Sequence, residues 1–124
     1  MIYIAGPVTG HEDDNRQAFE EARGRLEAAG VPRVRIDEER HYGELLLKIR
    51  QGILIPHEFV PEGTPWKEAM RLCVRALTYA DELVCLPGSQ DSRGARLEMK
   101  IARALGIPVY GLEQYLERLG RKQE

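Results

Sequence analysis

A glutamate in an apolar setting is the first candidate for chemistry in this sequence. Glu98 ends the stretch LPGSQDSRGARLE (residues 86–98) and lies between apolar residues of an expected helix. A partly desolvated carboxylate fits a purely structural role poorly, and it can act as a nucleophile or general base. The alternative is a solvated acid that pairs with Lys100 or Arg103.

The segment before Glu98 is typical of an anion-binding site. The apolar run 82–86 predicts a buried strand, and the glycine that follows Pro87 predicts a turn. A helix is expected to begin after Ser92, its N-cap, and the N–H groups and dipole of a helix N-terminus attract anions. The predicted ligand is a sugar or sugar phosphate, and the residues predicted to bind it here are Gly88, Ser92, Arg93 and Gly94.

A second glycine-bearing loop follows the first apolar run of the chain. Residues 2–5 predict a buried strand, and GPVTG follows at residues 6–10. Glycines let a ligand approach the backbone closely, so Gly6, Thr9 and Gly10 are predicted to line the same site. Tyr3 alternates with apolar residues on this strand, and the nearest polar place for its hydroxyl is the site at the end of the strand.

Strands that alternate with helices along the chain predict an α/β fold. The expected architecture is a Rossmann-like three-layer sandwich with a central parallel sheet of four to five strands. Strands are expected at residues 2–5, 53–55, 82–86 and 107–110, and helices at 14–29, 64–79, 92–105 and 113–119. Ligands bind such sheets beyond the carboxyl ends of the strands, which is where both glycine loops lie. The residues expected to pack the helix at 92–105 are Leu97, Ile101, Ala104 and Leu105.

Residues 31–52 follow the alternation least well. Val34 and Ile36 alternate with arginines, which allows a short edge strand, whereas Glu44 to Gln51 (ELLLKIRQ) predicts a helix. We interpret residues 31–52 as an insertion over a sheet edge or in an oligomer interface. The chain, residues 1–124, is expected to form a single domain.

Composition excludes several classes of function. A net charge of −2 gives no electrostatic reason to expect a nucleic acid polymer or a membrane as partner. Two cysteines without CxxC spacing and three scattered histidines favour no metal site and no disulfide. We expect a cytoplasmic protein, because no signal peptide or spanning segment is visible, and we expect no cofactor.

Three segments together resemble the nucleoside 2-deoxyribosyltransferase-like superfamily, and most closely its small DUF4406-type branch. They are IYIAGPVTG (2–10), ALTYADELVCLPG (76–88) and SRGARLEMKIARALGIPVYG (92–111). The resemblance implies a flavodoxin-like fold and a homo-oligomer. It also implies cleavage or transfer at the N-glycosidic bond of a (deoxy)nucleoside or its 5′-monophosphate, as in the related 2′-deoxynucleoside 5′-phosphate N-hydrolases.

The resemblance also implies roles for single residues. The residue matching Glu98 attacks C1′ of the sugar, and the tyrosine matching Tyr3 lies beside it, so both are predicted to be catalytic. A serine at the place of Ser92 helps to bind the 5′-phosphate. The superfamily usually has an aspartate that assists the leaving base where this chain has Cys73, and its branch often has a tryptophan where this chain has Ser89.

These departures leave three hypotheses. The first is an N-glycoside hydrolase or deoxyribosyltransferase that uses another acid such as Glu58 or Glu68 in place of the missing aspartate. The second is a non-catalytic nucleotide-binding module, which the thiol of Cys73 favours because a buried thiol is a poor proton donor. The third is a structural α/β protein whose loop glycines serve only packing.

Overall fold

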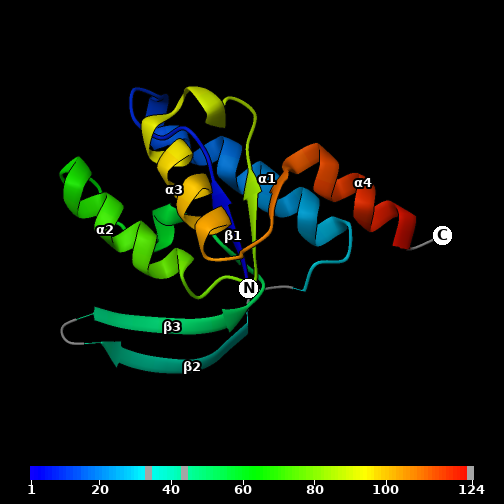
Figure 1. Ribbon diagram of the computed structural model, residues 1–124, viewed down its shortest axis with the longest axis horizontal. Coiled ribbons are helices and arrows are strands. Elements are labelled where there is room, and N and C mark those ends of the chain that lie inside the picture. The colour runs from blue at the N-terminus through cyan, green and yellow to red at the C-terminus, as the bar shows by residue number, and fades with distance from the viewer. Residues whose placement is uncertain (33–34, 43–44, 123–124) are drawn as a thin grey trace.

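A four-stranded parallel sheet forms the centre of the computed structural model, which describes residues 1–32, 35–42 and 45–122 (Figure 1). The strand order is β4-β1-β5-β6, and every pair is parallel. The strands are β1 (Ile2–Ala5), β4 (Ile53–Leu54), β5 (Glu82–Cys85) and β6 (Val109–Gly111). The helices are α1 (Arg16–Ala28), α2 (Trp66–Leu77), α3 (Arg93–Ala104) and α4 (Leu112–Lys122). This arrangement confirms the predicted α/β, flavodoxin- or Rossmann-like sandwich, with four strands.

Two apolar cores lie on the two faces of this sheet. Side chains of a strand alternate between its faces, so Ile2 and Ile4 of β1 join one core while Tyr3 and Ala5 join the other. Helices α1 and α4 cover the first face, and α2 and α3 cover the second (Figure 1). Strand β1 lies inside the sheet, with β4 on one side and β5 on the other, as the prediction of a central first strand requires.

The chain reverses its direction of travel across the sheet after β4. From β1 it crosses by α1 to β4, and it returns by α2 to β5 on the other side of β1. Loops that leave β1 and its neighbours therefore diverge to opposite faces, and a crevice opens at the carboxyl ends of these strands. The loops that meet there are 6–10 after β1, 55–64 after β4 and 86–92 after β5.

The predicted helix over Glu44–Gln51 is wrong. Residues Leu45–Gln51 form strand β3, which pairs antiparallel with β2 (Arg35–Tyr42) in a two-stranded sheet of its own. Figure 1 places this hairpin at the amino ends of the central strands, at the opposite end of the molecule from the crevice. The predicted edge strand at Val34 and Ile36 is confirmed as a strand only from residue 35, because Val34 lies outside the described residues.

Helix α3 begins as predicted but packs through different residues. The Ser92 hydroxyl accepts a hydrogen bond from the backbone N–H of Ala95 at 3.3 Å, which is an N-cap. The buried residues of α3 are Ala95, Glu98 and Ala102. Leu97 and Leu105, both predicted to pack, are 38% and 56% exposed. Met99 and Ile101 are partly buried and pack against the same core.

Helices α1 and α2 have no side-chain N-cap. Asn15 directly precedes α1, but its side-chain amide donates to the carbonyl of Pro7 at 2.8 Å. Helix α2 begins at Trp66, and the Thr64 hydroxyl donates to the Pro61 carbonyl instead of accepting from the helix. Among the described residues, no helix is both long and apolar enough to cross a membrane.

Candidate functional site

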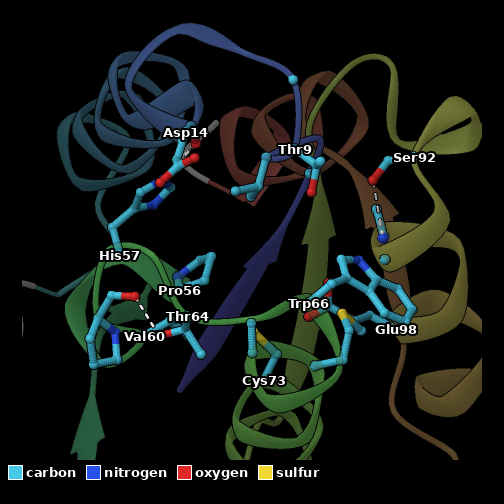
Figure 2. A pocket seen from close by; sticks show the side chains of 18 of the residues that line it. Thr9, Asp14, Pro56, His57, Val60, Thr64, Trp66, Cys73, Ser92 and Glu98 are labelled. Atoms are coloured by element: carbon cyan, nitrogen blue, oxygen red, sulfur yellow. Dashed lines mark hydrogen bonds between the residues drawn. The ribbon is translucent and has the colours of Figure 1, made fainter.

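The crevice at the strand ends contains a hollow of about 360 Å³, called here the inner hollow (Figure 2). All three strand-end loops contribute to its wall, together with the first turns of α2 and α3. A volume of this size lies within the range of small-molecule sites. Of the residues predicted to bind a ligand, those that line it are Gly6, Thr9, Gly10, Ser92, Gly94 and Glu98.

Glu98 is the one carboxylate buried among the described residues, at 6% exposure. It lies on the face of α3 that meets the sheet, where its neighbours are the buried Ala95 and Ala102. Its Oε2 atom has no hydrogen-bond partner among the residues that the structure describes. Burial raises the pKa of this carboxyl to about 7, and the nearby Tyr3 hydroxyl offsets part of that increase. Glu98 is therefore divided between its acid and its base form near neutral pH.

Tyr3 and Cys73 lie beside Glu98 on the sheet side of the hollow. Tyr3 is fully buried, and burial together with the charges of Glu98 and Cys73 raises the pKa of its hydroxyl well above 10.0. This hydroxyl has no hydrogen-bond partner within the described residues. Burial and the charge of Glu98 raise the pKa of the Cys73 thiol to about 12. Both groups thus stay protonated and can donate hydrogen bonds, and neither is a useful acid near neutral pH.

His57, which is not among the predicted site residues, lies just after the strand expected at residues 53–55 and lines the inner hollow. Its Nε2–H donates to the backbone carbonyl of Asp14 at 2.7 Å, because a carbonyl can only accept. Its ring also packs edge-on against Phe19, with the ring centroids 4.8 Å apart. Figure 2 shows His57 and Asp14 across the hollow from Glu98. The signal that could have found them is the position of residue 57, directly after a strand whose carboxyl end faces the site.

Unpaired buried polar atoms are concentrated at this site. Within the described part of the chain they are Tyr3 Oη, His57 Nδ1 and Glu98 Oε2. Native proteins pair nearly all buried polar atoms, so such a group calls for a ligand, a water or a catalytic role. His57 and Glu98 line the inner hollow, and Tyr3 lies next to Glu98.

A second hollow of about 610 Å³, the outer hollow, adjoins the first at the N-terminus of α3. The two share Thr9, Trp66, Ser92 and Gly94. Gly88 and Arg93, which were predicted to bind the same ligand as Glu98, line the outer hollow instead. The predicted site is thus divided into two connected parts.

Trp66 stands where the two hollows meet, and its role was not predicted. The guanidinium carbon of Arg93 lies 4.0 Å from the centre of the Trp66 ring, in a cation–π contact. Gly94 lets α2 and α3 approach, since a Cβ on this residue would lie 3.1 Å from the sulfur of Met70. Sequence periodicity placed Trp66 on the inner face of α2, but only the folded arrangement brings it to α3.

Two predicted substitutes for the missing aspartate do not lie at the site. Glu58 forms a salt bridge with Arg23, and neither it nor Glu68 lines either hollow. The ionisable side chains that do line the inner hollow are Asp14, His57, Cys73 and Glu98. No three His, Cys, Asp or Glu residues in the described ranges are grouped so that they could hold a metal ion.

Comparison with known proteins identifies one family. A family model described as "Domain of unknown function (DUF4406)" matches residues 1–111. A search of curated proteins found no match. The matched range contains every residue of both hollows, and it ends at the last strand of the sheet.

Proposed function

The chain belongs to the DUF4406 family, whose description states no function, and from the geometry of the site we propose that it cleaves or transfers the N-glycosidic bond of a (deoxy)nucleoside or its 5′-monophosphate. Membership of the nucleoside 2-deoxyribosyltransferase-like superfamily is part of this proposal. The observation that carries the proposal is the buried Glu98 carboxyl, unpaired at Oε2, on the wall of a hollow at the strand ends.

Glu98 is the proposed nucleophile. Its ionised carboxylate attacks C1′ of the sugar, the C1′–N bond breaks, and the bonding electron pair leaves with the base. Water then attacks C1′ of the glycosyl ester and returns the carboxylate, or a second base takes the place of water. Burial supports this role because it strips water from the attacking oxygens and strengthens every charge interaction in the hollow.

Tyr3 is proposed to hold the nucleophile in position. Its hydroxyl stays protonated, because its pKa is raised, and its proximity lowers the pKa of the Glu98 carboxyl. A donor at this place stabilises the charged form of Glu98, which is the form that attacks. Tyr3→Phe is therefore expected to raise the pKa of Glu98.

The leaving base is expected on the wall opposite Glu98. Displacement at C1′ is in line, so nucleophile and leaving group lie on opposite faces of the sugar carbon. In this crevice the opposite wall carries His57 and Asp14 (Figure 2). The Cys73 thiol, with a pKa of about 12, is a poor proton donor, and the Nε2–H of His57 is already donated to the Asp14 carbonyl. The departing base can therefore take its proton from His57 only when the imidazole is doubly protonated, through Nδ1, which has no partner among the described residues.

Base release from a panel of nucleosides and nucleoside monophosphates, followed by chromatography, tests the proposal. The wild-type protein is expected to release a base, and Glu98→Gln, which keeps the size of the side chain, is expected to lose at least a hundredfold in rate. Arg103→Gln is the matched control, because Arg103 lies on the same helix and lines neither hollow. Equal release by wild type and Glu98→Gln would refute the enzymatic role.

A non-catalytic nucleotide-binding module is the second candidate. The neutral thiol of Cys73, in the place where a carboxylic acid is expected, favours it. Thermal unfolding with the same panel separates the two, because a ligand at 100 times its dissociation constant adds about 2.7 kcal/mol to the free energy of unfolding. Stabilisation without any base release would support the binding module.

A further inference from the structure

Charge is divided unequally between the two hollows. The inner hollow is lined by the carboxylates Asp14 and Glu98 and by no lysine or arginine. The outer hollow is lined by Arg93 and His11, with the exposed Asp91 as its one carboxylate. A phosphate bound at Ser92, between the two, therefore finds its nearest lining guanidinium on the outer side.

Arg93 is held ready for an anion. Among the described residues it makes no salt bridge, although its guanidinium lies over the Trp66 ring at 4.0 Å. A guanidinium stacked on an aromatic ring keeps its N–H donors free in its own plane, and the stacking limits the rotamers that it can adopt. Two positive charges therefore attract an anion here: the oriented, unpaired guanidinium of Arg93 and the N-terminal end of the dipole of α3, a helix of twelve residues.

The outer hollow has room for more than one phosphate. Its volume is about 610 Å³, and the sugar and base are proposed to lie in the inner hollow, of about 360 Å³. The shared residues Ser92 and Gly94 lie on the boundary. The Ala95 amide there is capped by the Ser92 hydroxyl, so the first-turn amides left for a ligand are those of Arg93 and Gly94. A 5′-phosphate at this boundary leaves most of the outer hollow for a group attached to it.

We infer that the outer hollow binds a second phosphate beyond the 5′-phosphate, so that the preferred ligand is a nucleoside 5′-diphosphate or one of its esters. Arg93 contacts the second phosphate, Ser92 and the first-turn amides of α3 contact the first, and the sugar reaches Glu98 in the inner hollow. This inference rests on the proposed function, since it extends the same ligand outward from the same site.

Isothermal titration calorimetry with matched deoxynucleoside, monophosphate and diphosphate of each base tests the inference, using Glu98→Gln to prevent turnover. The diphosphate is expected to bind about tenfold or more tighter than the monophosphate, the usual worth of one charge-assisted hydrogen bond. In Arg93→Gln the diphosphate advantage is expected to disappear. Arg96→Gln, a change on the same helix outside both hollows, is expected to keep it.

Asp91→Asn is expected to change the affinity for the diphosphate in the opposite direction to Arg93→Gln. It removes the one carboxylate of the outer hollow, and is therefore expected to tighten the diphosphate more than the monophosphate. Equal affinity for mono- and diphosphate would overturn the second-phosphate site while leaving the proposed function in place. An equal loss for both ligands in Arg93→Gln would also overturn it, because Arg93 would then bind the first phosphate. Absence of binding by any nucleoside or nucleotide would overturn both proposals together.

Discussion

Glu98 is the one charged residue among the buried residues of α3, and the other two are Ala95 and Ala102. Its pKa of about 7 follows from burial, which penalises the charged form. The folded protein therefore binds a proton on this group between about pH 4.5 and pH 7, where the unfolded chain has already lost it. By linkage, the free energy of unfolding must fall as the pH rises through this window, and it must level off above it.

The first prediction is that Glu98→Gln abolishes this dependence. A shift from 4.5 to about 7 corresponds to about 3 kcal/mol, so at pH 8 the variant should be more stable than wild type by up to this amount. At pH 4 the two should be nearly equal. Urea unfolding across pH 4–8 measures the difference, and a constant difference across this range would contradict the assigned pKa.

Cys73 is the second residue whose replacement should have a predictable effect, here on the rate of base release. A carboxylic acid beside Glu98 makes two carboxyls share one buried site, so one of them keeps its proton near neutral pH and can donate it. We therefore expect Cys73→Asp to raise the rate of base release about tenfold or more over wild type. Cys73→Ser is the control, since a hydroxyl is no acid in this range. A rate no higher than that of Cys73→Ser would exclude a proton-donor role for this position.

At the scale of elements, a glycine after β1 sets how closely two strand-end loops approach. A Cβ on Gly6 would lie 2.8–3.0 Å from side-chain atoms of Leu86, which no real contact of this kind allows. Gly6→Ala should therefore destabilise the protein by about 1–3 kcal/mol. Gly24→Ala is the matched control: this glycine lies within α1 with nothing near its Cβ, so alanine should stabilise the helix by up to about 1 kcal/mol. Chemical denaturation of both variants shows whether the signs differ.

The β2–β3 hairpin should be dispensable for the site. Arg35 pairs with Gln51 across the two strands, so the two ends of the hairpin lie next to each other. Replacement of residues 35–51 by a few glycines and serines joins two chain ends that already lie close together. The new loop is short, so the free energy of unfolding should change by no more than about 1 kcal/mol. Nucleotide binding should be unchanged, since Figure 1 places the hairpin at the far end of the sheet. Calorimetry on this variant tests both points, and loss of binding would assign the hairpin a part in the site.

The success of sequence-based prediction differed among elements for physical reasons. Strand β1 is a short apolar run, β5 is apolar after Glu82, and each is followed by a glycine-bearing turn, so these signals are local. ELLLKIRQ places apolar residues at both helical and strand spacing, so only its antiparallel pairing with residues 35–42 decides its structure. Neither segment by itself predicts that pairing.

The same distinction applies to the site. Glu98, Ser92 and the glycine loops carry local signals in the form of a buried acid, an N-cap and turns. Trp66 carries none, because the approach of α2 to α3 brings it to the site, and the one signal for His57 is its position after a strand. Leu97 and Leu105 are exposed for a related reason: which apolar residues of a helix become buried is decided by the surface that the helix meets.

At the scale of the whole molecule, the homo-oligomer remains a prediction. Helix α3 presents Leu97 and Leu105, the two large hydrophobic residues that are exposed in the described part of the chain. If a second copy covers them, Leu105→Glu should shift the protein toward the monomer without loss of helix content. Light scattering after size-exclusion chromatography measures this, and a monomeric wild type at every concentration would contradict it.

The position of β1 inside the sheet also determines when the fold can first exist during synthesis. Both strands that flank β1 come later in the chain, and β5 ends 80 residues after Ala5. At 5–20 residues per second, a nascent chain carries β1 without its β5 neighbour for roughly 4–16 s. During this interval one edge of β1 is open to non-native pairing. Slower translation before codon 85 should therefore lower the soluble yield, whereas the same delay after codon 85 should not.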